Sequence, residues 1–89
     1  MTARHLLIHG IVQGVGFRWA LAAEAERSGV RGWVRNRQDG TVEAHLEGPL
    51  DSVLEVVTWA HTGPRYARVS HVEVRAVADE GASSFEIEP

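Results

Sequence analysis

The 89-residue sequence predicts an α+β fold of the ferredoxin-like type, in which two helices cover one face of a mostly antiparallel sheet. Three observations lead to this prediction. Apolar residues alternate with a period of two in separate stretches, two helical patterns lie between those stretches, and the order is βαββαβ with a short strand added at the C-terminus. Two right-handed crossovers around a hairpin produce such a sandwich. We expect residues 1–89 to form a single domain.

The first strand is predicted over residues 5–12, with its even-numbered residues on the core face. Gly10 inside this strand predicts a bulge or the close passage of another segment. A helix is predicted over residues 17–28, because Phe17, Leu21 and Ala25 recur at helical spacing. Gly29 directly follows, and glycine is the preferred residue just beyond a helix end.

Two strands, over residues 30–36 and 41–47, form the predicted central hairpin. Asp39-Gly40 in the turn between them is a strong hairpin signal. Apolar residues of the second strand alternate with Thr41, Glu43, His45 and Glu47. We therefore expect this hairpin to have one solvated face.

The second half of the chain predicts one more helix and two strands. The helix follows from five apolar residues at helical spacing: Leu50, Val53, Leu54, Val57 and Ala60. It begins either at a capping box of Ser52 and Glu55 or nearer to Pro49. A fourth strand contains residues 72–76, and the out-of-phase Val69 predicts a bulge or a late strand start. Phe85 and Ile87 belong to a short final strand.

Composition excludes several function classes. The chain has no cysteine, which excludes disulfides, thiolate metal sites and a thiol nucleophile. A net charge of -3 argues against a general nucleic-acid binder. No signal peptide and no apolar run of membrane-spanning length is present. We expect a cytoplasmic monomer that binds neither nucleic acid nor membranes.

Metal binding is not expected either. His5 and His9 share a strand face but lie about 13 Å apart at the usual rise per residue, too far for one ion. The remaining histidines are scattered along the chain. The sequence also lacks the nucleophile elbow of serine hydrolases and the phosphate-binding loop of nucleoside triphosphatases. Trp19 stands where a dinucleotide-binding fingerprint needs its third glycine.

The segment between the first strand and the first helix predicts a phosphate site. Gly14 and Gly16 permit positive φ and close approach to backbone N–H groups. The helix N-terminus adds unpaired N–H donors and partial positive charge. Arg18 in the first turn opposes the helix dipole, at a cost of up to about 1 kcal/mol, and an anion between arginine and turn removes this conflict.

The predicted topology brings Asn36 to the same edge of the sheet as Arg18, although the two residues are 18 positions apart. Taken singly, each feature has an ordinary explanation. The glycines fit a tight strand-to-helix turn, Arg18 fits a solvated surface, and Asn36 fits a turn-forming residue before Asp39-Gly40. Only their combination favours a functional site.

Two segments resemble the signature motifs of the acylphosphatase family. The first is Gly10-Ile11-Val12-Gln13-Gly14-Val15-Gly16-Phe17-Arg18, and the second is Gly32-Trp33-Val34-Arg35-Asn36 followed by Asp39-Gly40-Thr41-Val42-Glu43. Similarity extends over nearly the whole chain. The resemblance implies a ferredoxin-like enzyme that hydrolyses acyl phosphates to a carboxylate and inorganic phosphate without metal or cofactor.

By position, the resemblance implies that Arg18 and Asn36 are the catalytic pair. Arg18 would bind the phosphate through its guanidinium fork, and Asn36 would orient the attacking water. The proton would pass to the substrate phosphate, because an asparagine cannot act as a base. Thr41 either supports Asn36 or is simply a β-forming residue. The phosphate loop would consist of the backbone N–H groups of Gln13, Gly14, Val15, Gly16 and Phe17.

Two other function classes compete with this interpretation. A non-catalytic phosphate-binding regulatory module would keep the same fold and anion site. A ferredoxin-like RNA binder needs exposed aromatic residues on a basic sheet. The predicted sheet face carries instead histidine, aliphatic and glutamate residues, which makes it a poor surface for stacking bases.

Overall fold

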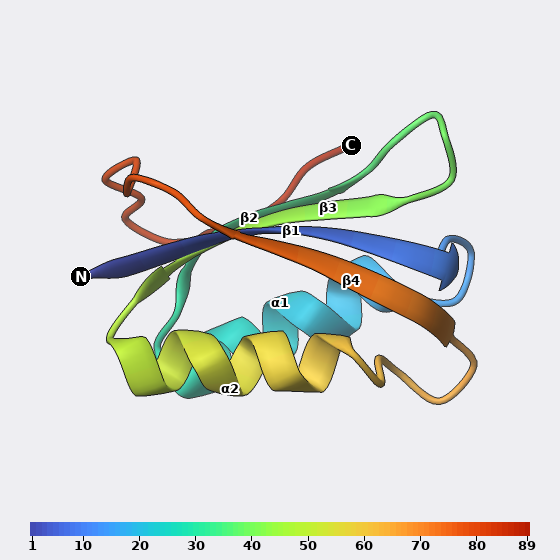
Figure 1. The fold of residues 1–89 in the computed structure, drawn as a ribbon, viewed down its shortest axis with the longest axis horizontal. Helices are drawn as coiled ribbons and strands as arrows, with labels where there is room; N and C mark the ends of the chain where they lie inside the picture. The colour runs from blue at the N-terminus through green and yellow to red at the C-terminus, as the bar shows by residue number, and fades with distance from the viewer.

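The structure, a computed structural model, describes residues 1–89 and has two helices on one face of a five-stranded sheet (Figure 1). The elements are β1 (Thr2–Ile11), α1 (Phe17–Ser28), β2 (Arg31–Asn36), β3 (Val42–Gly48), α2 (Leu50–Ala60), β4 (Arg68–Ala76) and β5 (Phe85–Ile87). The strand order is β4-β1-β3-β2-β5. All neighbouring pairs are antiparallel except β2 and β5, which are parallel. The predicted fold class is confirmed.

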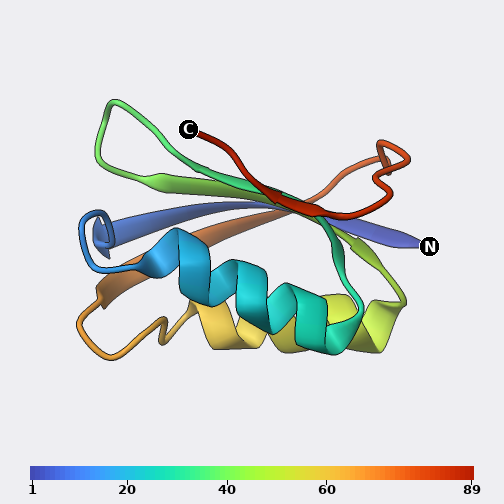
Figure 2. The same ribbon diagram turned by 180° about the vertical axis from the view of Figure 1, so that it is seen from behind.

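The hydrophobic core lies between the sheet and the two helices (Figure 2). Leu6 and Ile8 of β1 are fully buried, as the alternation predicts. Helix α1 buries the predicted stripe along one side, and its bounds agree with the prediction. Gly29 follows α1 in the left-handed conformation, with φ 74°, so its predicted role at the helix end is confirmed as well.

Helix α2 begins at the second of its two predicted starts, nearer Pro49, and differs from the prediction on its buried side. It begins immediately after Pro49, whose carbonyl accepts a hydrogen bond from the Val53 N–H, 3.0 Å away. Ser52 therefore lies inside the helix, so the predicted start near Pro49 is confirmed and the alternative start at a capping box is excluded. The fixed φ of proline favours a helix start at this point. Val56 is buried, whereas Leu50 and Leu54 of the predicted apolar stripe are exposed.

The predicted irregularity near Gly10 and Val69 is a β-bulge. His9 lies opposite His71, but Gly10 lies opposite Val69, so Ser70 has no partner on β1. The backbones approach so closely here that a Cβ at Gly10 would lie 2.1 Å from the carbonyl oxygen of Arg68. Strand β4 begins at Arg68, so the bulge is confirmed and a late start is excluded.

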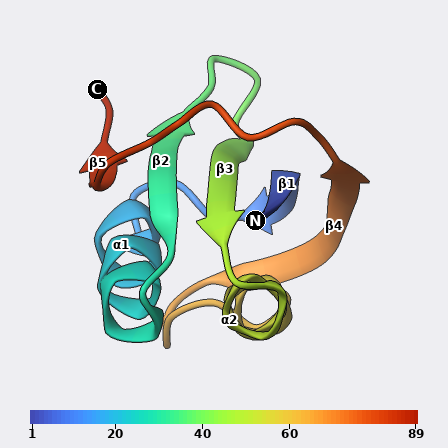
Figure 3. The ribbon, with the colours of Figure 1, turned by 90° about the vertical axis from the view of Figure 1, so that its left-hand side faces the viewer.

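The prediction of a solvated face on the central hairpin is wrong for β3. Glu43, His45 and Glu47 of that face are buried, with 8 %, 2 % and 1 % of their surfaces exposed. The connection from β4 to β5 passes over β3 and β2 on the side away from the helices (Figure 3). Glu47 accepts hydrogen bonds from two backbone N–H groups of this connection, those of Glu80 and Ala82. Alternation in the sequence does not reveal that a distant segment covers the strand.

The connection between β1 and α1 and the turn between β2 and β3 lie at the same end of the sheet (Figure 2). The predicted site residues are distributed over these two segments and the first turn of α1. The topology thus brings them to one edge. No helix of the structure has the length and apolar character needed to cross a membrane.

Candidate active site

The loop of residues 13–16 is held between two buried anchors. Val12 at its start and Phe17 at its end are 1 % and 2 % exposed, and the Phe17 ring packs against Trp59. Gly14 and Gly16 have φ angles of 75° and 78°, a conformation that favours glycine. A Cβ at either position would meet no atom within 4 Å, so these glycines are required for backbone conformation and not for space.

The loop presents free backbone donors. The N–H groups of Gly14, Val15 and Gly16 donate no hydrogen bond to another backbone group, and Gly16 caps α1 without a side-chain cap. The first turn of α1 contains no acidic residue, whereas Arg18 adds a positive charge there. Unpaired donors, the helix dipole and a cation together make this edge attractive to an anion.

Arg18 and Asn36 line one cavity of about 130 Å³. Its other lining residues are Val12, Gly14, Gly16, Phe17 and the exposed Trp19. The Asn36 side chain makes no hydrogen bond within the chain, so both its carbonyl and its amide are free. No histidine, cysteine, aspartate or glutamate lines this cavity, which gives it no candidate metal ligand of those types.

Arg18 is positioned by the C-terminal end of the chain. Its Nη1 donates a hydrogen bond to the carbonyl oxygen of Glu88, 2.9 Å away. The Glu88 N–H in turn donates to the carbonyl oxygen of Val34 on β2, at 2.8 Å. A guanidinium has five N–H donors, so most of them stay available for a ligand. This contact was not predicted, because no local pattern connects residues 70 positions apart.

Gln13 links the loop to the hairpin turn through its side chain. Its Nε2 donates to the carbonyl oxygens of Arg37 and Thr41, at 2.7 and 2.9 Å. The sequence predicted only a backbone role for Gln13. The side-chain role has no signature in sequence spacing, since the acceptors are backbone carbonyls of a distant turn.

Thr41 supports the hairpin turn and does not line the cavity. Its hydroxyl and its backbone N–H both donate to Oδ1 of Asp39, at 2.6 and 3.0 Å. These two hydrogen bonds, assisted by the charge of Arg37, lower the pKa of the Asp39 carboxyl below its usual value. Thr41 thereby stabilises the turn that follows Asn36, and it makes no side-chain hydrogen bond to Asn36 itself.

A second, larger hollow adjoins Asn36. It has a volume of about 510 Å³ and no hydrophobic lining residue. Arg35 and Arg37 lie on it, together with Gln38, Asp39 and Pro89. Arg35 also pairs with Glu43 at 2.6 Å, and Glu43 accepts a hydrogen bond from His5 at 2.7 Å. Burial opposes ionisation of Glu43, but these partners hold the pKa of its carboxyl below the usual 4.5.

Comparison with known proteins places the chain in a family. The family model described as Acylphosphatase matches residues 4–87. An acylphosphatase of Thermococcus kodakarensis is 53 % identical over 83 residues, which cover 93 % of this chain and 91 % of that protein. An acylphosphatase of Pyrobaculum arsenaticum is 62 % identical over 76 residues, covering 84 % of this chain and 80 % of that protein.

Solved structures agree with this assignment. The crystal structure of the acylphosphatase from Bacillus subtilis superimposes with a TM-score of 0.97 at 34 % identity, and the match covers 100 % of both chains. The acylphosphatase from Coxiella burnetii gives a TM-score of 0.95 at 36 % identity, covering 98 % of this chain and 92 % of that one. Full-length HypF matches with a TM-score of 0.88 at 25 % identity, over 99 % of this chain but only 12 % of HypF.

The fold and the comparisons define a small α+β hydrolase. The chain belongs to the acylphosphatase family. It is an enzyme that hydrolyses acyl phosphates, as the two motifs predicted.

Proposed function

We propose that the loop of residues 13–17 and the Arg18 guanidinium together bind the phosphoryl group of an acyl phosphate. The single observation that carries the proposal is that Arg18, the two loop glycines and Asn36 line one cavity although they come from separate elements. The free N–H groups of residues 14–16 and the unused donors of Arg18 match the oxygens of a phosphate.

Asn36 orients the water that attacks phosphorus. Its side-chain amide is free of intramolecular hydrogen bonds, and the adjacent turn is held by Gln13 and Thr41. Water attacks phosphorus, the bond from phosphorus to the acyl oxygen breaks, and the carboxylate departs with the bonding electron pair. The proton of the water passes to a phosphate oxygen of the substrate. This role asks for positioning and charge stabilisation, which dominate phosphoryl transfer.

No general acid or base is needed from the protein in this scheme. A carboxylate is a good leaving group, and the cavity contains no titratable residue apart from Arg18. We propose that the reaction proceeds without metal or cofactor. A single domain over residues 1–89, a monomeric state, a cytoplasmic location and the lack of nucleic-acid binding stay predictions.

The test is hydrolysis of benzoyl phosphate in the presence of EDTA. Arg18→Ala and Asn36→Ala are each expected to lower kcat/KM by about 10²–10³-fold, the usual effect of removing one group that stabilises the transition state. Arg27→Ala, on the exposed side of the same helix, is the matched control and is expected to retain full activity. The thermal unfolding midpoint should stay unchanged in all three variants.

Unchanged activity in either Arg18→Ala or Asn36→Ala would contradict the mechanism. Loss of wild-type activity in EDTA, restored by a divalent metal, would contradict metal independence. Phosphate binding without any wild-type turnover would favour the alternative of a regulatory module.

A further inference from the structure

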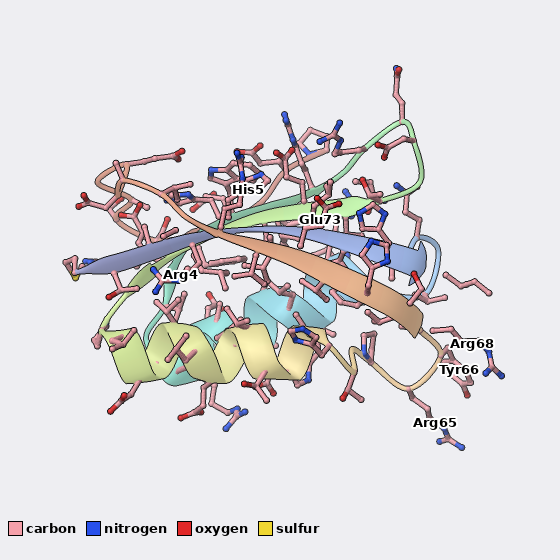
Figure 4. All side chains as sticks on the ribbon, viewed as in Figure 1. Arg4, His5, Arg65, Tyr66, Arg68 and Glu73 are labelled. Atoms are coloured by element: carbon pink, nitrogen blue, oxygen red, sulfur yellow. The ribbon has the colours of Figure 1, made fainter.

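Three side chains of metal-ligand type meet on the sheet face that is turned away from the helices. His9 on β1 lies directly opposite His71 on β4, and Glu73 lies two residues further along β4. One potential ligand atom from each residue lies within 4.8 Å of the other two. Figure 4 shows Glu73 on this face, beside β4 and clear of the helices.

The sequence did not predict this cluster. His9 and His71 are 62 positions apart, and their pairing depends on the register of β1 and β4. Two histidines at directly opposed strand positions bring their rings together on one face. The two imidazole rings are stacked, with centroids 4.0 Å apart and planes inclined by 11°.

The distances between the three donor atoms fit a tetrahedral ion after small adjustments. Because the two imidazoles are stacked, their lone pairs lie in nearly parallel planes, so the exposed His71 ring must also rotate before both rings can bind one ion. Bonds of 2.0–2.1 Å place two tetrahedral ligands about 3.3 Å apart. Nε2 of His9 and Oε2 of Glu73 are now 2.6 Å apart, so this pair must open by about 0.7 Å. No pair must close by more than about 1.5 Å, given the 4.8 Å limit. Side-chain rotation supplies such shifts, since His71 and Glu73 are exposed.

The backbone beneath these side chains is held in place. The bulge begins directly after the pair of His9 and His71. At the bulge, Gly10 packs against the backbone of β4 so tightly that a Cβ would lie 2.1 Å from the Arg68 carbonyl oxygen and 2.8 Å from the Ser70 nitrogen. Because the backbone of the two strands is already ordered, binding a metal ion would cost only the conformational entropy of the three side chains. None of the three ligands belongs to the hydrophobic core or lines the cavity of Arg18 and Asn36.

We propose that His9, His71 and Glu73 form a binding site for Zn²⁺, with water completing the tetrahedron. Two imidazole nitrogens and one carboxylate oxygen are ligands that zinc prefers, whereas Mg²⁺ and Ca²⁺ prefer oxygen alone. The site shares no residue with the phosphate-binding cavity, and the proposal does not rest on the reaction proposed there. The ordinary alternative is a solvated ion pair between His9 and Glu73, which would bind no ion.

Calorimetric titration of the metal-stripped protein with ZnCl₂ tests this proposal. The chain must carry no histidine tag, because a tag binds zinc itself. One ion per chain is expected, and Mg²⁺ in large excess is expected not to compete. His71→Gln and Glu73→Gln should each weaken binding by about tenfold or more, since loss of groups that only support ligands already costs that much.

His61→Gln is the matched control, because His61 is also exposed but lies beyond α2 and contacts the Val57 carbonyl oxygen. It is expected to bind Zn²⁺ like the wild type. Circular dichroism should show that every variant is folded. Benzoyl phosphate hydrolysis in EDTA should be equal in wild type and His71→Gln, which separates this site from the catalytic one. The proposal would be overturned if the wild type did not bind one Zn²⁺ per chain, or if His71→Gln bound Zn²⁺ with unchanged affinity.

Discussion

Polar groups are left without partners within the chain at one end of the sheet and are paired at the other end. At the end that holds the β1–α1 loop, the N–H groups of residues 14–16 and the Asn36 side chain have no partner within the chain. At the other end, Glu47 accepts hydrogen bonds from His45, Glu80 and Ala82. The first end is therefore prepared to bind a ligand, whereas the second is completed by the chain itself.

The closed end, formed by His45, Glu47 and the β4–β5 connection, is held together by buried hydrogen bonds under a loop. Nε2 of His45 lies 2.6 Å from Oε2 of Glu47, and the two side chains are 2 % and 1 % exposed. The Glu80 carboxylate lies 3.7 Å from the other ring nitrogen of His45 and accepts a hydrogen bond from Trp33. Burial opposes ionisation of Glu47, but its hydrogen-bond donors hold its pKa below the usual 4.5. We therefore expect changes at this end to affect stability, and changes at the other end to affect activity.

The largest expected effect is on stability, from Glu47→Ala. The substitution leaves His45 and two backbone N–H groups of the β4–β5 connection without an acceptor. A buried hydrogen-bonding group left without its partner costs about 1–3 kcal/mol, so we expect the unfolding free energy to fall by about 3 kcal/mol or more. Urea denaturation measures the loss. Glu55→Ala on the exposed side of α2 serves as the control, with an expected change within about 0.5 kcal/mol.

If Glu47→Ala is too unstable to purify, Glu47→Gln keeps the shape and one acceptor oxygen. Its expected loss is smaller, about 1–3 kcal/mol. Equal stability of Glu47→Gln and wild type would show that the two ends do not differ as described. Activity per folded molecule should be unchanged in either variant.

The second effect is on activity, from Arg18→Lys. Lysine keeps the charge but cannot form the planar fork or reproduce its fixed donor geometry. We expect kcat/KM for benzoyl phosphate to fall about 10²-fold or more, with an unfolding midpoint like that of the wild type. Arg27→Lys makes the same change on the exposed side of α1, where the arginine pairs only with Glu24. If both variants lose activity equally, the effect of Arg18→Lys does not come from the cavity.

Much of the fold could be predicted because it depends on local patterns. The bounds of α1, the turn at Asp39-Gly40 and the bulge at Gly10 follow from side-chain periodicity and from glycine conformation. Of the two predicted starts of α2, the structure has the one next to Pro49, and the local sequence alone did not decide between them. The buried face of β3 was missed because the covering segment lies 33–35 residues further along the chain.

The candidate site shows the same division between local and distant contacts. The glycine loop, Arg18 and Asn36 could be found from two motifs and the predicted topology, and they line one cavity. The contacts that hold them could not be found, because they end on backbone carbonyls. Gln13 reaches the carbonyls of the hairpin turn, and Arg18 reaches that of Glu88. Backbone acceptors occur at every residue, so the sequence does not distinguish them.

A smaller effect is expected from Gln13→Ala, which cuts the link between the phosphate loop and the hairpin turn. The substitution removes two hydrogen bonds, so the turn next to Asn36 is held less firmly against the loop. We expect kcat to fall about fivefold to tenfold, corresponding to about 1 kcal/mol, with a smaller change in KM. Gln38→Ala, exposed on the same turn, is the control. A wild-type kcat in Gln13→Ala would restrict Gln13 to the backbone role predicted from sequence.

The smallest effect is a pH dependence of stability at the closed end. The pKa of Glu47 is lowered on folding, so below about pH 4.5 the unfolded chain binds a proton that the folded chain does not. The stabilisation is complete above pH 4.5 and is lost as the pH falls through the lower, folded value. The excess stability of wild type over Glu47→Gln should therefore shrink as the pH falls below the usual value of 4.5. Glu80 and the other two carboxyls with a lowered pKa, Asp39 and Glu43, are present in both proteins, so their contributions largely cancel in the difference. His45 contacts Glu47 directly, so the difference includes the loss of that contact. Urea unfolding at each pH measures it, and a difference that stays constant or grows towards low pH would contradict a carboxylate held ionised by its covering loop.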